Sequence, residues 1–274
     1  MIVLAGGDSF VWGSELADSS ETQHSLRTFA AQLSGFNEYL CVARPGFGND
    51  SIARTVIAQC EQLLTERPFV IVSWTFPGRF EFRFNYNTKQ RNSPWYTINA
   101  WTVTQNVESI QREFMAENRD ILDYQIATIN RAKQTGVAEF AETFYRHVGD
   151  SEYWEVYSTL KEIVYLQNYL KANGIGYMFT CADNTFWYNH TIETADSTIQ
   201  SLVEQIAKDQ DNWFWFAAAT EQWNTQKPRG FYQWAVENKY SMGTTHPLEE
   251  SHSAATQLMK DKFNELVKKS IQQN

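Results

Sequence analysis

Short apolar runs alternate with segments of helical periodicity along most of the chain. The apolar runs predict strands over residues 2–5, 39–42, 69–72, 177–179 and 213–216. Apolar residues that recur every three or four positions predict helices over 20–33, 50–64, about 156–170 and about 255–267. Strands that alternate with helices form parallel β-α-β units. The sequence therefore predicts an α/β fold, a three-layer α/β/α sandwich around a mostly parallel sheet.

One long stretch interrupts this alternation after the third predicted strand. Between about residues 76 and 114, aromatic side chains stand among Asn, Thr and Arg, and residues 119–147 have helical character. The whole chain holds 10 Trp, 13 Tyr and 18 Phe, rings that either fill a core or form a platform for sugars. The sequence shows no second core, internal repeat or flexible linker. We therefore predict a single domain, 1–274, with an aromatic-rich insertion at about 76–147.

The net charge and the cysteine pattern exclude several classes of protein. A formal net charge of −9 and a pI of about 5.1 argue against nucleic-acid binding, which requires a basic face. Cys41, Cys60 and Cys181 are widely spaced, so a structural zinc site or a disulfide framework is not expected. The sequence contains no transmembrane stretch and no recognisable signal peptide. We expect a cytoplasmic protein with no membrane partner.

Polar loops follow the predicted strands at the points where the strands end. Ser9 comes just after the first strand, residues 46–50 follow the second, residues 74–79 follow the third, and His246 precedes the last helix. Open α/β sheets bind their ligands beyond the carboxyl ends of the strands. We therefore expect these four loops to share one edge of the sheet.

The first of these loops carries a candidate nucleophile. Gly6 and Gly7 permit a sharp turn from strand to helix that exposes the hydroxyl of Ser9 beside Asp8. A serine hydroxyl needs a base to take its proton and donors to receive the developing oxyanion. The alternative is that Ser9 only caps a helix.

The second loop offers those donors. Gly46, Gly48 and Asn49 stand just before a predicted helix, where backbone N–H groups and an Asn amide form an oxyanion hole. A glycine turn with Asn49 or Asp50 as the helix cap explains the same residues equally well.

The base is sought among five histidines, of which His246 alone lies in a loop at the predicted edge. His252 follows within the first turns of the last helix. A spacing of six does not bring two histidines to one helical face, so we expect no metal site. No cofactor is expected either.

Taken together, these loops resemble the blocks of the SGNH (GDSL-type) hydrolases, a flavodoxin-like α/β family of esterases, lipases and carbohydrate deacetylases. Gly7-Asp8-Ser9, Gly46-Phe47-Gly48-Asn49 and His246-Pro247 match in block order over nearly the whole chain. The resemblance implies that Ser9 is the nucleophile, with its N–H as an oxyanion donor. It places a second donor at Gly48 or Asn49 and the base at His246 rather than His252.

Two family features are absent. The Gly-x-Asn-Asp block after the third strand is replaced by residues 73–79, and the acid three residues before the histidine is replaced by Gly243. His246 would then act in a Ser–His dyad oriented by a carbonyl, or borrow Asp183, Glu249 or Glu250 as its acid. A weakened or inactive site is the third possibility.

The sequence thus predicts a serine ester hydrolase that acts on a small-molecule or glycan ester, such as an acylated carbohydrate. Asp8, Trp74 and Arg79 are the candidates for substrate contacts, although Trp74 is equally explained as a core residue and Arg79 as a surface ion pair. The alternatives are a catalytically degenerate binding or assembly protein, and a Mg²⁺-dependent phosphatase for which only Asp8 and Asp50 are available.

Overall fold

The computed structural model describes residues 1–84, 95–104, 119–188, 196–217 and 229–272. The chain divides into two compact units. The first unit comprises Met1–Pro77 and Val156–Asn274, and the second comprises Gly78–Glu155. Most of the predicted insertion falls in the second unit, although its residues 85–94 and 105–118 lie outside the described part. The single-domain organisation stays a prediction.

The first unit is built on a four-stranded parallel sheet. Its strands are β1 (Ile2–Gly6), β2 (Glu38–Cys41), β3 (Phe69–Trp74) and β6 (Tyr177–Cys181), in the order β2-β1-β3-β6. Val3 lies opposite both Tyr39 and Phe69, and Ile71 lies opposite Met178. Every residue of β3 is buried, as expected for a central strand covered on both faces. The predicted α/β fold with a mostly parallel sheet is confirmed.

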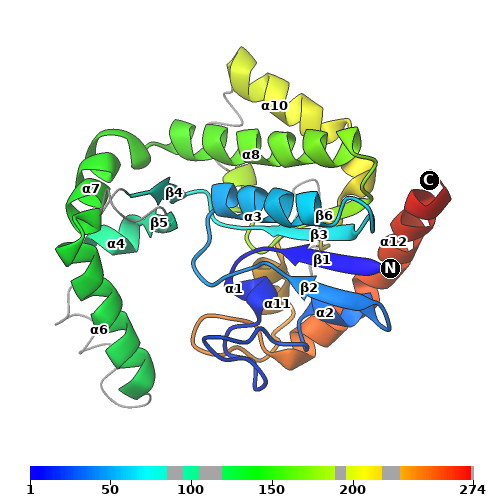
Figure 1. Cartoon of the computed structure of the whole chain (residues 1–274), viewed down its shortest axis with the longest axis horizontal. Coiled ribbons are helices and arrows are strands. Elements are labelled where there is room, and N and C mark those ends of the chain that lie inside the picture. The colour runs from blue at the N-terminus through cyan, green and yellow to red at the C-terminus, as the bar shows by residue number, and fades with distance from the viewer. Residues whose placement is uncertain (85–94, 105–118, 189–195, 218–228, 273–274) are drawn as a thin grey trace. The chain divides into compact units, whose positions relative to one another are not determined.

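Helices cover both faces of this sheet (Figure 1). One face packs against α3 (Asn49–Gln62), α10 (Ser197–Ala207) and the part of α8 (Glu152–Ala172) that belongs to this unit. The other face packs against α2 (Phe29–Ser34), α11 (Phe231–Glu237) and α12 (Glu249–Gln272). Because side chains alternate along a strand, Leu4 and Val70 enter the first core, while Val3 and Ile71 enter the second. The unit is therefore a three-layer sandwich.

The helix predicted over 20–33 is mostly wrong. Only α2, from Phe29, is helical, and its N-cap Thr28 accepts a hydrogen bond from the N–H of Ala31. The preceding residues form a loop, because Asp18 binds the N–H of Leu26 at 2.9 Å and the N–H of Ser25 binds the carbonyl of Trp12 at 2.8 Å. The helix therefore begins at Phe29, and Leu26 of the predicted apolar face lies outside it.

The fifth predicted strand, over 213–216, is present only as isolated bridges. Trp213 forms a parallel bridge with Phe179, and the N–H of Phe214 donates to the carbonyl of Phe179 at 2.8 Å. Phe216 pairs instead with Arg229 in an antiparallel bridge. Short 3-10 helices, Thr185–Tyr188 and Gln210–Asn212, lie in the same part of the chain.

The second unit has its own small core. It contains an antiparallel pair, β4 (Arg79–Arg83) and β5 (Trp95–Asn99), the helices α4 (Ala100–Thr104), α6 (Arg119–Gln134) and α7 (Val137–Phe144), and a π-helix, Tyr145–Gly149. Its core is formed by Phe80, Ile98, Ala132, Val137, Ala141 and Tyr145. The hydroxyl of Tyr145 donates to the carbonyls of Gly78 at 2.7 Å and Ile98 at 3.1 Å, which fixes the π-helix to the strand pair.

The cysteines are free thiols, and Cys60 and Cys181 are buried. Over the ranges that the structure describes, none of the helices combines the length and the apolar character required to cross a membrane.

Candidate active site

Ser9 is the first residue of α1 (Ser9–Trp12), a single helical turn that begins directly beyond β1. The N-cap is Asp8, whose carboxylate accepts a hydrogen bond from the N–H of Phe10 at 3.0 Å. Gly13 ends the turn in the left-handed conformation, with a φ of 81°. This short helix therefore holds Ser9 at the carboxyl edge of the sheet, with 8% of its surface exposed.

Hydrogen bonds join two strand ends and the start of a helix at this edge. The hydroxyl of Thr75, just beyond β3, donates to the Asp8 carboxylate. The N–H of Thr75 donates to Asn49 Oδ1 at 2.9 Å, and Asn49 Nδ2 donates to the carbonyl of Thr75 at 3.1 Å. These bonds connect the ends of β1 and β3 with the start of α3, the helix that follows β2. They bring the first two predicted loops to one place.

His246 lies beside Ser9, although 237 residues separate them in the chain. Its Nε2 is 2.7 Å from Ser9 Oγ. A tight turn holds the ring in place, since the N–H of Gly243 donates to the carbonyl of His246 at 2.8 Å and Met242 bridges to Pro247. The ring also packs against Phe10, with 4.8 Å between centroids. The serine and the histidine are thus within direct proton-transfer distance.

Glu15 contacts the other side of the same imidazole ring. Its Oε1 is 2.9 Å from His246 Nδ1. Thr245 also binds this carboxylate, through its N–H at 3.1 Å and its hydroxyl at 2.8 Å. Glu15 has a φ of 71°, a left-handed conformation that is costly for a residue with a side chain. Such backbone strain persists where the surrounding contacts fix it, as they do here.

The contacts of the ring determine its tautomer. An ionised carboxylate only accepts hydrogen bonds, so the proton of a neutral His246 lies on Nδ1, facing Glu15. Nε2 is then an acceptor for the hydroxyl hydrogen of Ser9. In this geometry Nε2 is placed to accept the hydroxyl proton of Ser9.

Glu15 is held in its charged form. Burial alone raises the pKa of this carboxyl group, but hydrogen bonds from His246 and Thr245, together with the charge of His246, lower it from 4.5 to about 2. The carboxylate is therefore ionised at any pH at which an imidazole can act as a base.

The predicted donor loop lies at the N-terminus of α3. Gly48 is the N-cap, in an extended conformation, and the backbone N–H groups of Ser9, Gly48 and Asn49 donate to no acceptor within the described ranges. The side-chain amide of Asn49 is committed elsewhere, because Nδ2 also donates to Thr159 Oγ1 at 3.1 Å. The suggestion that this amide itself serves as an oxyanion donor is therefore wrong; the backbone donors remain.

Two of the three predicted substrate contacts are fully buried. Asp8 and Trp74 have no exposed surface. Trp74 packs edge to face on Phe179 with 5.3 Å between ring centroids. It is therefore a core residue, which was the alternative to a substrate contact. Arg79 lies in the second unit, at the start of β4. Asp8 binds Phe10 and Thr75 within the site, whereas Trp74 is a core residue.

None of the acids proposed from the sequence binds His246. Asp183 accepts hydrogen bonds from Thr185 and Gln233, and Glu249 accepts one from the N–H of Ala17. Glu250 lies in the first turn of α12 and has no contact with His246 within the described ranges. Sequence reasoning missed Glu15, which stands in an irregular loop where no periodicity or spacing marks it.

His252 takes no part in this arrangement. It is 1% exposed, and its Nδ1 accepts a hydrogen bond from the N–H of Phe29 at 3.2 Å. Burial, followed by the charge of His246, lowers the pKa of His252 from 6.5 to about 3. Across the described ranges, no three His, Cys, Asp or Glu side chains are grouped as a metal ion would require.

Comparisons with known proteins give structural neighbours only. No protein-family model and no curated protein matches the chain. A psychrotrophic esterase from a Pseudoalteromonas species, inhibited by monoethylphosphonate, is similar with a TM-score of 0.42 and 12% identity, over 99% of this chain and 98% of that one. A GDSL-like lipase from Bacteroides thetaiotaomicron is similar with a TM-score of 0.40 and 15% identity, over 96% of this chain and 88% of that one. A catalytic mutant of an acetylxylan esterase from Geobacillus stearothermophilus is similar with a TM-score of 0.39 and 12% identity, over 96% of this chain and 93% of that one.

Proposed function

We propose that the protein is a serine ester hydrolase with Ser9 as the nucleophile and His246 as the general base. The observation that carries this proposal is the 2.7 Å contact between Ser9 Oγ and His246 Nε2, on a ring whose other nitrogen faces a carboxylate. A serine that merely capped a helix would need no imidazole at its hydroxyl. Asp8, not Ser9, is the N-cap of α1.

The reaction is an acyl transfer in two halves. Nε2 of His246 takes the hydroxyl proton as Ser9 Oγ forms a bond to the ester carbonyl carbon. The imidazolium returns that proton to the departing alcohol oxygen as the carbon–oxygen bond breaks. Water, deprotonated by the same nitrogen, then attacks the acyl-enzyme and releases the acid and Ser9.

The developing oxyanion needs donors, and backbone N–H groups supply them in this proposal. Those of Ser9 and of Gly48 or Asn49 donate to no acceptor in the described residues. The N-terminus of the 14-residue helix α3 adds a positive dipole end. Because Asn49 is tied to Thr75, and Thr75 to Asp8, these donors and the nucleophile are held in one rigid cluster.

For the substrate we propose an ester of a small molecule or an acylated carbohydrate. The support is the excess of aromatic residues in the sequence, since flat rings stack on sugar faces. The competing proposal is a degenerate binding protein, which would keep the Ser9 to His246 contact without turnover.

Two measurements test the hydrolase. Wild-type protein is incubated with p-nitrophenyl acetate and, separately, with a fluorescent fluorophosphonate, beside Ser9→Ala and Ser14→Ala. We expect turnover and labelling in wild type and in the Ser14→Ala control, and neither in Ser9→Ala. Absence of both in correctly folded wild type would refute the hydrolase and favour the binding protein. Acetylated xylo-oligosaccharides, compared with p-nitrophenyl butyrate, then test the carbohydrate proposal.

A further inference from the structure

Two positions of the chain lie close to His246 Nδ1, and only one of them carries a side chain. Glu15 reaches this nitrogen from the loop that follows α1, and Gly243 lies in the turn that carries His246. A Cβ atom added at Gly243 would collide with Glu15 Oε2 and lie 3.0 Å from Glu15 Cδ. A side chain at 243 therefore requires the Glu15 carboxylate to move from its present place.

The backbone of Gly243 does not itself require glycine. The glycines with positive φ are Gly13, Gly35, Gly46, Gly136 and Gly174, and Gly243 is not among them. Its φ therefore does not favour glycine, and the neighbour that limits a side chain at 243 is the Glu15 carboxylate.

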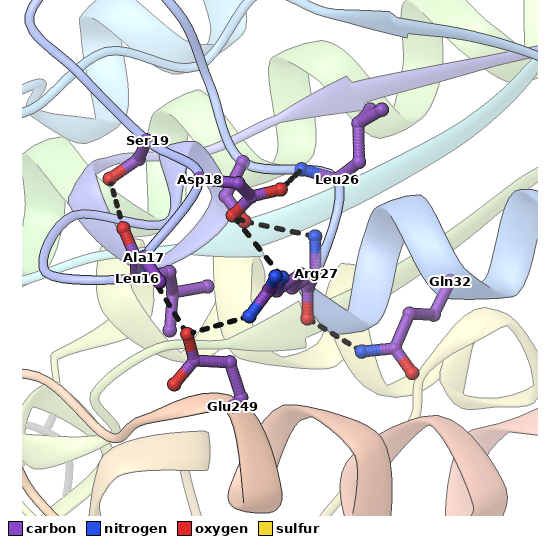
Figure 2. A network of polar contacts seen from close by, with 9 residues as sticks. Leu16, Ala17, Asp18, Ser19, Leu26, Arg27, Gln32 and Glu249 are labelled. Carbon is purple, nitrogen blue, oxygen red and sulfur yellow. Dashed lines mark hydrogen bonds and ion pairs between the residues drawn. The ribbon is translucent and has the colours of Figure 1, made fainter.

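The loop that carries Glu15 is fastened close to the turn of His246. Figure 2 shows the network: Asp18 accepts from the N–H of Leu26, and the N–H of Ala17 donates to Glu249 at 3.0 Å. Arg27 pairs with the same Glu249 carboxylate at 3.4 Å. Glu249 begins α12, three residues after His246, so the loop and the histidine are attached to one element. This anchoring holds the Glu15 carboxylate in place before any substrate binds.

We propose that Glu15 is the positioning acid of the active site and that it stands in for an acid at position 243, so that the two positions are interchangeable. This inference rests on the proposed function. Glu15 acts through His246: it fixes the proton on Nδ1 and stabilises the imidazolium that forms when Ser9 attacks. It does not touch the reacting atoms. Thr245 supports it by donating two hydrogen bonds to the carboxylate.

The experiment moves the acid from one position to the other. Glu15→Ala, Gly243→Asp and the double variant are compared with wild type in p-nitrophenyl acetate turnover, fluorophosphonate labelling rate and thermal unfolding. Glu15→Gln is added because it keeps the shape and removes the charge. Glu21→Ala, which removes an exposed carboxylate from the same loop, is the matched control.

We expect Glu15→Ala and Glu15→Gln to lower kcat about 10²- to 10⁴-fold with little change in KM, as when a triad loses its acid. Glu21→Ala should match wild type. Gly243→Asp alone should unfold at a lower temperature, because two carboxylates then compete for one space. The double variant should unfold at a higher temperature than Gly243→Asp. Its kcat should be at least tenfold higher than that of Glu15→Ala.

The experiment separates failure of the hydrolase proposal from failure of the role of Glu15 and of the interchange with position 243. If wild type neither turns over the ester nor is labelled, the hydrolase proposal fails. If wild type is active and folded Glu15→Gln has wild-type kcat, only the role of Glu15 is overturned. If Glu15→Gln is impaired but the double variant is folded and no faster than Glu15→Ala, the interchange with position 243 is wrong.

Discussion

Ser9 and Glu15 contact opposite nitrogens of one imidazole ring, although they are only six residues apart in the chain. Ser9 Oγ is 2.7 Å from Nε2 of His246, and Glu15 Oε1 is 2.9 Å from Nδ1. The turn α1 and the loop after it therefore supply both flanking groups from one segment. A single long-range placement, that of the His246 turn, completes the arrangement.

Replacing His246 should abolish turnover while leaving the fold intact. His246→Asn removes the base, and we expect kcat/KM for p-nitrophenyl acetate to fall by about 10³-fold or more. The exposed His147→Asn serves as the control. Steady-state kinetics with circular dichroism check the result; a loss below tenfold in folded His246→Asn would contradict the assignment of the base.

Acid should destabilise the protein through His252. The unfolded chain binds a proton at this histidine near pH 6.5, whereas the folded protein, in which burial lowers the pKa of His252 to about 3, does not. The unfolded state therefore binds more protons in this window, and stability falls as the pH drops from about 6.5 towards 3. The slope from this group approaches about 1.4 kcal/mol per pH unit.

Urea unfolding between pH 7 and pH 4 measures this effect. In His252→Asn the side-chain oxygen still accepts from the N–H of Phe29 but does not titrate. We expect a less steep pH dependence in the variant above pH 5, where few carboxyl groups titrate. Identical slopes for the two proteins would show that His252 is not the source.

The side chain of Asn49 should contribute to the stability of the fold. Asn49→Ala leaves the buried N–H and carbonyl of Thr75 and the hydroxyl of Thr159 without this partner. We expect the free energy of unfolding to fall by about 2–4 kcal/mol, because each buried unsatisfied group costs about 1–3 kcal/mol. Asn37→Ala, which removes an amide that donates to the carbonyl of Ser34 at the end of α2, is the control. An unchanged urea midpoint in Asn49→Ala would overturn the structural role of this amide.

Gly13 should be irreplaceable for a reason that Gly35 does not share. Both glycines have positive φ, 81° and 58°, so alanine costs backbone strain at either position. A Cβ at Gly13 would lie 2.5 Å from Ser25 Cβ and 2.8 Å from Thr28 Cγ2, whereas at Gly35 it meets nothing within 4 Å. Gly13→Ala should therefore lower the unfolding temperature more than Gly35→Ala and slow fluorophosphonate labelling of Ser9. Equal shifts in the two variants would refute the steric argument.

The regular part of the fold followed from the sequence. The central strand β3 is a continuous apolar run, and the helices α3, α8 and α12 show the spacing of residues that pack on a sheet. The location of Ser9 and His246 at one edge of the sheet was predictable too, because parallel strands end on the same side of a sheet.

The irregular part was not predictable, and Glu15 lies in it. The pattern over 20–33 counts Leu26 as part of an apolar helical face, yet Leu26 is 60% exposed and helix α2 starts at Phe29. The intervening loop is fixed by Asp18, Ser25 and Glu249, polar contacts whose partners are distant in the chain or follow no period. A carboxylate carried by such a loop reaches His246 through tertiary structure alone.

The collision between Glu15 and a side chain at Gly243 also constrains the order in which substitutions can accumulate. A chain that acquired Asp at 243 while it kept Glu15 would hold two carboxylates in the space of one. A chain that lost Glu15 first would pass through a protein without an acid at its histidine. Each of the two single substitutions that separate the arrangements is therefore expected to give a variant that is either less stable or slower.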